Sequence, residues 1–438
     1  EAHPVGFQWF MKAKLDPRRG IGPRGGAKMI HIDPRFTRTS AVSDVYARIR
    51  TGTDVAFFGG LINYVLEKNL IHYEYVRNYT NASFLVKDGF GFNEGLFSGY
   101  DHAKRMYDTS TWTYEGDAPA QAAFERTQKE IVAHGQGPAA AGAGVALAKR
   151  DMQLEHPRSV FQLLRKHYSR YTPQMVASIT GIPEEQFLEI AKIVGETGKP
   201  DKVMTIVYAV GLTHHTTGGQ LIRTAAILQL LLGNMGRPGG GMNAERGHAN
   251  IQGNTDNAIS WEILPGYLRI PAPGQKNLND YVTQSAPNKF DSNSWNFFGT
   301  NYRKFMVSLL KTWYGDKATD KNEYAFDFLP KPFTNSSWIS IYDQALKKKM
   351  EGLILSGMTA TSIGPDANQV MQALANLKWL AVMDPLPTTS SEFWRRPGAD
   401  PKTIQTEVFM VPSTHWIEKD GSFVNSGRWM QWKEAAIQ

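Results

Sequence analysis

The chain has 438 residues, of which 42% are hydrophobic and 20% charged, and this composition excludes a disordered, collagen-like or disulfide-stapled protein. It contains no cysteine, which excludes disulfides, thiolate metal sites and iron–sulfur ligation by the chain itself. The net charge is +7, but no Lys/Arg run exceeds three residues and no nucleic-acid-binding motif accompanies it. We therefore expect no nucleic-acid partner, because a basic interior that serves an anionic ligand explains the charge at least as well.

The length predicts two or three domains at roughly 100 to 200 residues each, and we expect two large ones. The longest apolar stretch, around residues 225–232, is far shorter than the roughly 20 residues that cross a bilayer. The chain starts at Glu1 without an initiator methionine, a basic region or an apolar leader. We therefore expect the native N-terminus to be missing or removed.

Short apolar runs that end at polar or glycine residues and are followed by helical patterns predict parallel strands of an α/β sheet. Ligands of open parallel sheets bind beyond the carboxyl ends of the strands, so each strand end is a candidate binding loop. Two pairs of such strands predict two crevices. The four runs cover residues 27–32, 203–210, 352–355 and 379–383, and they end at Asp33, Gly211, Ser356 and Asp384.

Helical patterns cover residues 160–167, 183–195 and 218–232, and the last of these ends at Gly233 and Asn234. A glycine-rich loop follows, with residues 245–253 at its end, and its glycines let the backbone approach a ligand closely. The low-complexity stretch 135–148 predicts a surface loop. Residues 284–340 are rich in Asn, aromatic residues and Lys, and they predict an insertion or surface excursion.

Polar residues follow the first and the fourth strand in a similar way. Asp33, Arg35, Thr37 and Asp54 come after the first strand, where a carboxylate can accept hydrogen bonds from ribose or guanine, and Arg and Thr can reach phosphates. The alternative is that Asp33 caps a turn and that Asp54 caps a helix beginning at Val55. Asp384 precedes a hydroxyl cluster, Thr388, Thr389, Ser390 and Ser391. The repetition predicts two nucleotides, or one cofactor with two nucleotide arms.

Two further groups of residues are candidates for chemistry. His214 and His215 are neighbours at a predicted strand end, where side chains point in opposite directions, so hydrogen-bonding histidines are favoured over a metal pair. Arg246 and His248 lie in the glycine-rich loop. A guanidinium matches a carboxylate bidentately, and an imidazole can donate a hydrogen bond or move a proton. The residues alone leave a structural role for this pair open.

The runs from Leu231 to Gly236 and from Arg246 to Gly253, with the glycines between them, resemble the molybdopterin oxidoreductase (DMSO reductase) superfamily. More narrowly, the chain is similar to the catalytic subunits of respiratory, membrane-associated formate dehydrogenases. Together the matching segments cover nearly the whole chain and are specific as a combination. The other matching segments are 1–4, 32–39, 50–54, 110–115, 169–173 and 425–429.

The resemblance implies an α/β fold of two Rossmann-like nucleotide-binding domains with mostly parallel sheets, built around two molybdopterin guanine dinucleotides that hold one Mo or W. It assigns residues 1–250 to the first domain and 251–410 to the second, with the insertion at 284–340, and 411–438 to a segment leading into a further domain. No metal ligand is implied within this chain. One guanosine arm would contact Asp33, Arg35, Thr37 and Asp54; the other would contact Gly357, Thr361, Asp384 and Thr388; and Gly211, Thr213 and His214 would approach a pterin or its phosphates.

The same resemblance implies that Arg246 orients a formate carboxylate beside the metal and that His248 handles a proton. The reaction implied is formate to carbon dioxide, or the reverse, with the two electrons carried by the metal because ordinary side chains cannot accept them. Expected partners are a missing N-terminal portion with a selenocysteine or cysteine and a [4Fe–4S] cluster, an iron–sulfur electron-transfer subunit and a membrane cytochrome subunit. We expect a periplasmic location, membrane association through partners, and no activity of this fragment alone.

Two other functions remain as alternatives. A periplasmic nitrate reductase would share the fold and the cofactor, but the sequence Arg246-Gly247-His248 favours formate. A non-catalytic scaffold subunit of a respiratory complex would keep the fold without the metal. The presence of Arg246 and of both guanosine-type patterns argues against a scaffold.

Overall fold

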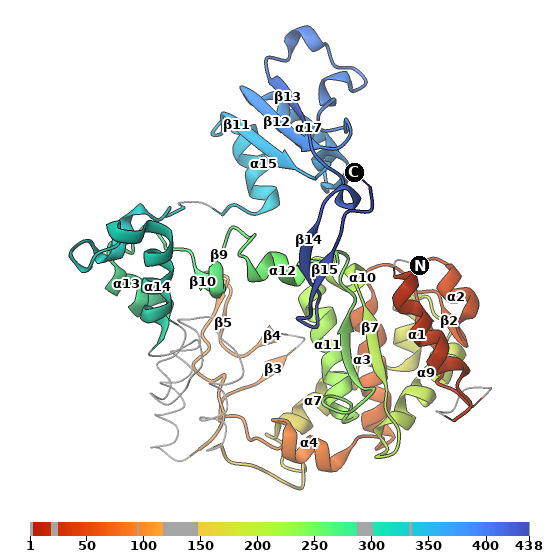
Figure 1. Cartoon of the computed structure of the whole chain (residues 1–438). Coiled ribbons are helices and arrows are strands. Elements are labelled where there is room, and N and C mark those ends of the chain that lie inside the picture. The colour runs from red at the N-terminus through yellow and green to blue at the C-terminus, as the bar shows by residue number, and fades with distance from the viewer. Residues whose placement is uncertain are drawn as a thin grey trace. The chain divides into compact units, whose positions relative to one another are not determined.

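The computed structural model describes residues 3–18, 25–93, 96–116, 148–286, 301–332 and 335–437. The chain divides into two compact units, Glu1–Gly247 and His248–Gln438, whose elements are labelled in Figure 1. Most of the predicted loop at 135–148, and residues 287–300 of the predicted insertion, lie outside the described residues.

Two pairs of parallel strands form the sheet part of the first unit. Strand β1 (Ile30–Ile32) pairs with β2 (Val45–Ala47), and the chain passes between them through α2 (Arg38–Val42). Strand β7 (Thr205–Tyr208) pairs with β8 (Gly241–Ala244), so that Thr205 lies opposite Gly241. Parallel neighbours require crossover connections, which are helical in both pairs. In each pair the two carboxyl ends therefore lie at the same edge.

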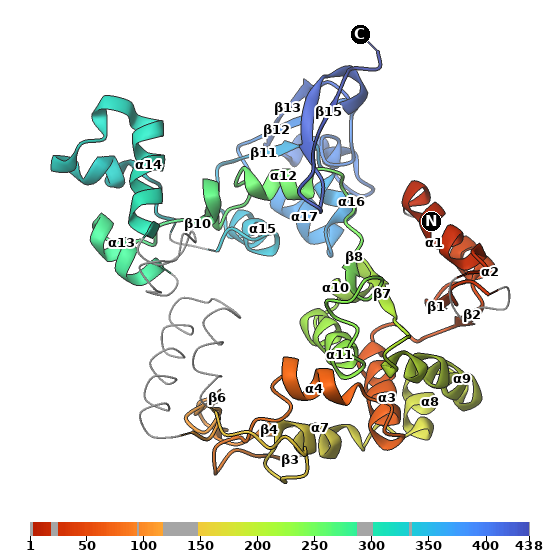
Figure 2. The same cartoon turned by 60° about the horizontal axis from the view of Figure 1, so that its bottom comes forward.

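Helix α3 (Asp54–Glu67) is the centre of the first unit's hydrophobic core. It contacts α7 (Val160–Tyr168), α8 (Pro173–Thr180), α9 (Glu184–Gly195) and α11 (Gly218–Leu231), and Figure 2 shows it beside α8 and α9. Ile62, Val65 and Leu66 on α3 are at most 1% exposed. Complete burial of such side chains stabilises a fold by about 1.5 to 3 kcal/mol each. The predicted helices at 160–167, 183–195 and 218–232 are confirmed.

The two ends of α8 show how the local sequence determines where a helix begins and ends. The Thr172 hydroxyl accepts a hydrogen bond from Met175 N at 3.2 Å, and Pro173 occupies the first turn, where its missing N–H costs nothing. Gly181 ends the helix with φ +77°, a backbone conformation that favours glycine. The other elements of the unit are α1 (Pro4–Leu15), α4 (Tyr73–Tyr79), β3 (Phe92–Asn93), β4 (Leu96–Phe97), β5 (Tyr100–Asp101), β6 (Met106–Tyr107), η1 (Glu196–Gly198) and α10 (Val210–Thr213).

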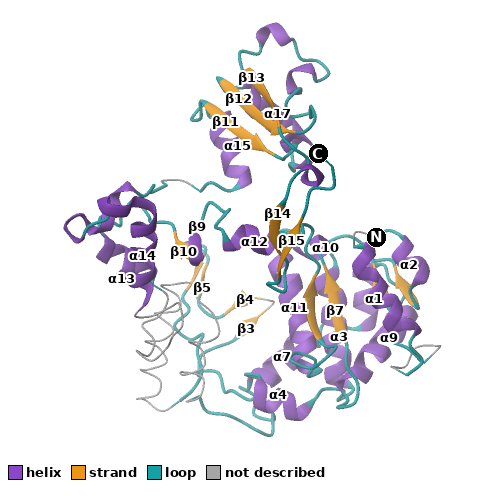
Figure 3. Ribbon diagram, viewed as in Figure 1, coloured by secondary structure: helices purple, strands orange, loops and turns teal. Residues whose placement is uncertain are grey.

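A parallel three-stranded sheet in the order β11-β12-β13 forms one core of the second unit (Figure 3). Its strands are β11 (Gly352–Ser356), β12 (Trp379–Asp384) and β13 (Glu407–Pro412). Leu355, Leu380 and Val382 from the strands pack with residues of α15 (Trp338–Leu346) and α17 (Ala367–Ala375). The α/β fold class is thus confirmed. The predicted strands at 352–355 and 379–383 are confirmed as well.

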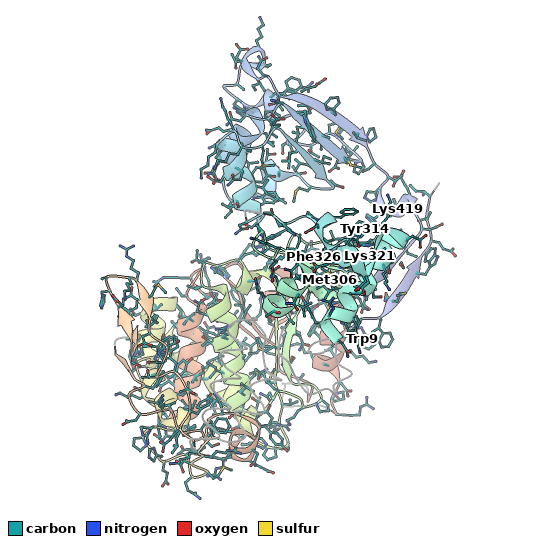
Figure 4. The ribbon with its side chains drawn as sticks, turned by 90° about the vertical axis from the view of Figure 1, so that its left-hand side faces the viewer. Trp9, Met306, Tyr314, Lys321, Phe326 and Lys419 are labelled. Atoms are coloured by element: carbon teal, nitrogen blue, oxygen red, sulfur yellow. The ribbon has the colours of Figure 1, made fainter. Side chains whose placement is uncertain are left out.

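Helices build a second core in the same unit. Helix α13 (Leu278–Ser285), helix α14 (Tyr302–Tyr314) and the 3-10 helix η5 (Asp320–Phe328) contribute buried residues to it, and Met306 and Phe326 are labelled in Figure 4. The Tyr281 and Tyr302 hydroxyls lie 3.0 Å apart. Burial raises the pKa of both phenols. Part of the predicted insertion at 284–340 therefore shares a core with residues that precede it.

Helix α12 (Ile251–Asp256) and the antiparallel hairpin of β14 (Gly421–Val424) and β15 (Met430–Lys433) also contact each other within the second unit. No helix among the described residues is both long and apolar enough to span a membrane. The remaining elements are β9 (Ile263–Leu264), η2 (Pro265–Tyr267), β10 (Leu268–Arg269), η4 (Gly315–Lys317), α16 (Ala360–Ile363), η6 (Phe393–Arg395), η7 (Pro401–Thr403) and η8 (Trp416–Glu418).

Candidate functional site

The first group of predicted site residues lies at the carboxyl end of β1 and β2. Asp33 N donates to Ala47 O at 3.2 Å, which carries the pairing of the strands one residue beyond β1. Asp33 Oδ1 accepts a hydrogen bond from Arg35 N at 2.7 Å, so the carboxylate closes the turn, as one of the two interpretations of the sequence expects. The Thr37 hydroxyl accepts from the N–H groups of Thr39 and Ser40 and caps α2.

Asp54 follows the loop after β2, and it does not cap a helix. The alternative in which Asp54 caps a helix beginning at Val55 is wrong, because α3 begins at Asp54 itself, and the side chain of the N-cap residue, Thr53, makes no capping bond. Burial raises the pKa of the Asp54 carboxyl, while the nearby His215 partly opposes that shift. A Cβ at Gly52 would lie 3.9 Å from His215 Nδ1, which brings the loop before α3 next to this histidine.

Arg50 fixes the same loop. Its Nη1 donates to Ser178 O at 2.6 Å and to Ile179 O at 3.1 Å, at the end of α8. Its backbone N–H donates to Thr180 O at 2.8 Å. The guanidinium therefore satisfies carbonyl groups of the last turn of α8 and holds residues 50–54 against that helix.

The second group lies at the carboxyl end of β7 and β8. The predicted strand at 203–210 is shorter than expected, because Val210 begins α10; Gly211 and Thr213 lie in that helical turn, and His214 is its C-cap. His214 and His215 therefore do not sit on a strand end, which corrects the geometry assumed from the sequence. A Cβ at Gly211 would meet no atom within 4 Å, so its backbone is open to a ligand.

Arg246 leaves the same edge as Gly211. Glu245 N donates to Tyr208 O at 2.7 Å, one residue past the β7–β8 pairing, and the Arg246 side chain that follows is exposed. The carbonyl oxygen of Arg246 accepts a hydrogen bond from His3 Nε2 at 2.6 Å. Arg246 thus stands on an open loop whose backbone is tied to the first described residue of the chain.

His248 belongs to the second unit. Its side chain is exposed, and its Nδ1 accepts a hydrogen bond from Asn250 N at 2.9 Å. A neutral imidazole with Nδ1 as acceptor carries its proton on Nε2. The predicted loop at 245–253 is partly wrong, since Ile251 begins α12.

The third group lies at the carboxyl ends of β11 and β12. Gly357 N donates to Met383 O at 2.9 Å, and Gly357 has φ +62° with no atom within 4 Å of an added Cβ. Thr361 Oγ1 lies 2.7 Å from Thr389 Oγ1 and 3.2 Å from Ser390 Oγ. The loops after the two strands therefore meet in a cluster of hydroxyl groups.

Asp384 and Thr388 complete this third group. Asp384 is the last residue of β12 and lies opposite Pro412 of β13. The backbone N–H of Thr388 donates to Ser391 Oγ at 2.9 Å, while the Thr388 hydroxyl accepts from Ser391 N at 3.3 Å. This reciprocal pair orders the loop that carries Thr389 and Ser390.

These three groups fit an anionic nucleotide cofactor. Each lies at the carboxyl ends of parallel strands, where nucleotides bind in open α/β sheets, and each offers hydroxyl groups, a carboxylate or an open glycine backbone. The described residues contain no cluster of three or more His, Asp or Glu that suits a metal ion.

Several residues of these groups have contacts that local sequence patterns do not reveal. Thr389 and Ser390 were visible as part of a hydroxyl cluster, yet their contacts with Thr361 connect two loops about 30 residues apart. His215 was considered only together with His214, and its proximity to Asp54 arises only in the fold. The contact between His3 and Arg246 joins residues 243 positions apart and has no local pattern.

Comparisons with known proteins identify the family of the chain. A model of the molybdopterin oxidoreductase family matches residues 3–391. The formate dehydrogenase major subunit of Haemophilus influenzae is 45% identical over 99% of this chain and 39% of its own length. The nitrate-inducible formate dehydrogenase major subunit of Escherichia coli is 44% identical over 99% of this chain and 40% of its own length.

Among solved structures, acetylene hydratase from Pelobacter acetylenicus aligns with 95% of this chain and 41% of its own chain. The sequence identity is 14% and the TM-score is 0.46, and this similarity supports no argument about function. The chain spans about two fifths of the length of the curated relatives it matches. The family match covers most of the chain, and the relatives align along nearly all of it. The chain therefore belongs to the molybdopterin oxidoreductase family, whose cofactor is a molybdopterin that carries Mo or W.

Proposed function

We propose that this chain is the central part of the catalytic subunit of a formate dehydrogenase, which converts formate to carbon dioxide or the reverse. The observation that carries the proposal is Arg246, an exposed guanidinium on an open loop at the carboxyl end of a parallel strand pair. Formate is little more than a carboxylate. A planar guanidinium fork is the side chain that binds such a group bidentately.

The cofactor proposed is a pair of molybdopterin guanine dinucleotides. Asp33, Arg35, Thr37 and Asp54 would hold one guanosine arm, and Gly357, Thr361, Asp384 and Thr388 the other. The open backbone of Gly211, with Thr213 and His214, would face a pterin or its phosphates. When bound, the cofactor supplies a metal centre that accepts two electrons, which no side chain of this chain can do.

The chain itself contributes binding and proton handling. Arg246 would orient the carboxylate of formate through charge-assisted hydrogen bonds, each worth about 1.5 to 3 kcal/mol. His248 would donate a hydrogen bond from its Nε2–H to a formate oxygen, and in the reverse direction it would supply that proton. Its Nδ1 already accepts a hydrogen bond from Asn250 N. Nε2 is therefore the ring atom left for the substrate side.

The complete protein would contain further parts. A portion outside this chain would provide a selenocysteine or cysteine ligand and a [4Fe–4S] cluster, since this chain has no cysteine. An iron–sulfur subunit would carry the electrons away, and a membrane cytochrome subunit would anchor the assembly at the periplasmic face. These assignments follow from the kinship with formate dehydrogenase major subunits.

The complete enzyme with its partner subunits tests the proposal. We expect formate-dependent reduction of an artificial electron acceptor, Mo or W in elemental analysis, and guanosine monophosphate released by acid. Nitrate reduction without formate oxidation would instead indicate a different oxidoreductase of the same family. A folded assembly that retains neither metal nor guanine nucleotide would contradict an enzymatic role.

A further inference from the structure

Asn250 precedes helix α12 as its N-cap residue, yet its side chain makes no capping hydrogen bond. Asparagine is among the most favoured N-cap residues because its side-chain oxygen accepts from the first N–H groups of the helix. Here Asn250 Oδ1 instead accepts from the backbone N–H of Val424 at 2.9 Å, in strand β14. The side chain thus leaves its own helix end and reaches a strand 174 positions later in the sequence.

The other polar groups of Asn250 are also in use. Its Nδ2 donates to Asn254 Oδ1 at 3.0 Å, one turn further along α12, which fixes the orientation of the amide. Its backbone N–H donates to His248 Nδ1 at 2.9 Å. One residue therefore connects the imidazole of His248, the helix α12 and the β14–β15 hairpin.

The packing around Asn250 is close enough to exclude a larger neighbour. A Cβ added at Gly253 would lie 2.0 Å from Asn250 Oδ1 and 3.2 Å from Val424 N. Real Cβ atoms do not approach other atoms at 2.0 Å, so glycine at this position is what allows the carboxamide to reach the strand.

A second link joins the far end of α12 to the turn of the same hairpin. Arg428 Nη2 lies 3.6 Å from Asp256 Oδ1, and the Arg428 guanidinium lies 5.9 Å from the centre of the Tyr267 ring. Tyr267 also donates a hydrogen bond to Asp256. The hairpin thus contacts α12 at both ends, and Asn250 is the contact at the end that carries His248.

We propose that Asn250 is a positioning residue for His248: by binding the β14 backbone with its side chain and His248 Nδ1 with its backbone, it holds the imidazole with the Nε2 proton available to the substrate. This inference rests on the proposed role of His248 in formate oxidation. The physical reason is that a proton-transfer group must be held in a defined orientation, and small displacements of such groups are costly to turnover.

Hydrogen exchange tests the structural half of the proposal without any activity measurement. In the complete enzyme, Asn250→Ala removes the acceptor of the Val424 N–H. Amide exchange at Val424 should then rise about fivefold to tenfold, the scale of one lost hydrogen bond. Asn250→Asp keeps an acceptor for Val424, and the Asn254 amide can rotate to donate to it, so exchange should stay near the original rate. Unchanged exchange at Val424 in Asn250→Ala would overturn the proposal.

A matched control lies at the other end of the same helix. Asn257 Nδ2 donates to Gly253 O at 2.9 Å, and its side chain has no bond to His248 or to the hairpin among the described contacts. Asn257→Ala should therefore leave exchange at Val424 unchanged. If both alanine variants accelerated that exchange equally, the effect would be a general loosening of α12 and the proposal would fail.

A double-mutant cycle tests the functional half. Asn250→Ala should lower kcat for formate about tenfold with a smaller change in KM, and Asn250→Asp should restore most of the loss. In a His248→Ala background, Asn250→Ala should add almost nothing, because both changes remove the same positioned imidazole. Fully additive losses would show that Asn250 acts by another route and would overturn the positioning role.

The two experiments also separate this inference from the proposed function. If the complete enzyme with its metal does not oxidise formate, the proposed function is wrong, whatever the exchange data show. In that case the exchange result still decides whether Asn250 holds the hairpin and the His248 segment together. If formate is oxidised but His248→Ala has no effect, the role of His248 is wrong and the positioning role falls with it.

Discussion

His3 Nε2 lies 2.6 Å from the carbonyl oxygen of Arg246. A carbonyl oxygen can only accept, so the imidazole carries its proton on Nε2 and donates it. The bond ties the start of α1 to the loop of the candidate substrate-binding residue. It orients the backbone of Arg246 and leaves the guanidinium exposed.

Replacing His3 by Ala should therefore lower kcat/KM for formate in the complete enzyme by about fivefold, which corresponds to one hydrogen bond of about 1 kcal/mol. Steady-state kinetics with formate provide the measurement. His102→Ala, which removes a histidine from the exposed turn after β5, serves as the control and should not change kcat/KM. Equal kcat/KM in the His3 variant and the original enzyme would show that this hydrogen bond does not contribute to activity.

Asp54→Asn should raise the melting temperature at neutral pH. Burial raises the pKa of Asp54 in the folded state, so the folded protein binds a proton that the unfolded chain releases, and stability falls as pH rises through the raised value. The amide removes this penalty. The gain should be below about 1 kcal/mol, because the group is only partly buried and solvent screens its charge.

Thermal melts across pH check the sign of this effect. The gain from Asp54→Asn should be largest near pH 7 and should vanish as pH falls below about 3, where the carboxyl is protonated in both the folded and the unfolded state. Asp88→Asn removes an exposed carboxylate and serves as the control. A gain that grew as pH was lowered would mean that the sign of the pKa shift is wrong.

The sequence predicted the helices better than the strands, for physical reasons. Helix α11 repeats its apolar residues every three or four positions, a local signal that survives without knowledge of the fold. Strand β8 begins at Gly241 and has no such signal. It is a strand because it pairs with β7 and because Gln229 Nε2 donates to Gly241 O at 2.7 Å, and both are tertiary contacts.

The candidate site could be predicted in part for the same reason. The rule that ligands bind beyond the carboxyl ends of parallel strands needs only the strand ends, so Asp33 and Asp384 could be named from the sequence. The rule says nothing of side chains that arrive from other loops. The contacts of His3 with Arg246 and of Thr361 with Thr389 depend on the fold.

Gly60→Ala should destabilise the first unit. Gly60 lies in the buried face of α3, and a Cβ there would come within 2.4 Å of Val176 Cγ2 and 2.8 Å of Phe187 Cζ. Both neighbours are fully buried and cannot move without disturbing the core. Overpacking of this kind costs about 1 to 3 kcal/mol, which a thermal melt detects.

A glycine in open space provides the control for that substitution. Gly219 lies in helix α11, and an added Cβ would meet no atom within 4 Å. Gly219→Ala should therefore leave the melting temperature unchanged or raise it, by up to about 1 kcal/mol of stability, because alanine restricts the unfolded chain. If Gly60→Ala were as stable as Gly219→Ala, the packing of α3 against α8 and α9 would be looser than the structure indicates.

Thr361→Val should reduce the amount of guanine nucleotide that the complete enzyme retains. The valine keeps the shape of the side chain but removes the hydroxyl that lies 2.7 Å from Thr389 Oγ1 and 3.2 Å from Ser390 Oγ. The loss of these two hydrogen bonds should destabilise the contact between the two loops by about 1 to 3 kcal/mol. Acid release of nucleotide, measured per mole of enzyme, should fall, while Thr312→Val on α14 should have no effect on it. Full nucleotide content in the Thr361 variant would exclude the hydroxyl cluster from the guanosine site.

Arg246→Lys tests the residue on which the proposed function depends. Lysine keeps the positive charge but loses the planar fork, and formate has almost no apolar surface that could compensate. We expect kcat/KM for formate to fall by roughly tenfold to a hundredfold, which corresponds to about 1.4 to 2.7 kcal/mol. Metal and guanine nucleotide content should remain unchanged, because Arg246 is assigned to the substrate and not to the cofactor.

A control variant checks the effect of Arg246→Lys, and two outcomes would contradict the proposed role of Arg246. Arg105→Lys changes an exposed arginine in the turn between β5 and β6 and should leave formate oxidation intact. If Arg246→Lys emptied the site of Mo or W while the protein stayed folded, Arg246 would be a cofactor-binding residue. If formate oxidation were unaffected with the cofactor retained, Arg246 would be a structural loop residue. The exposed position of its side chain, with the backbone already held by His3, leads us to expect neither result.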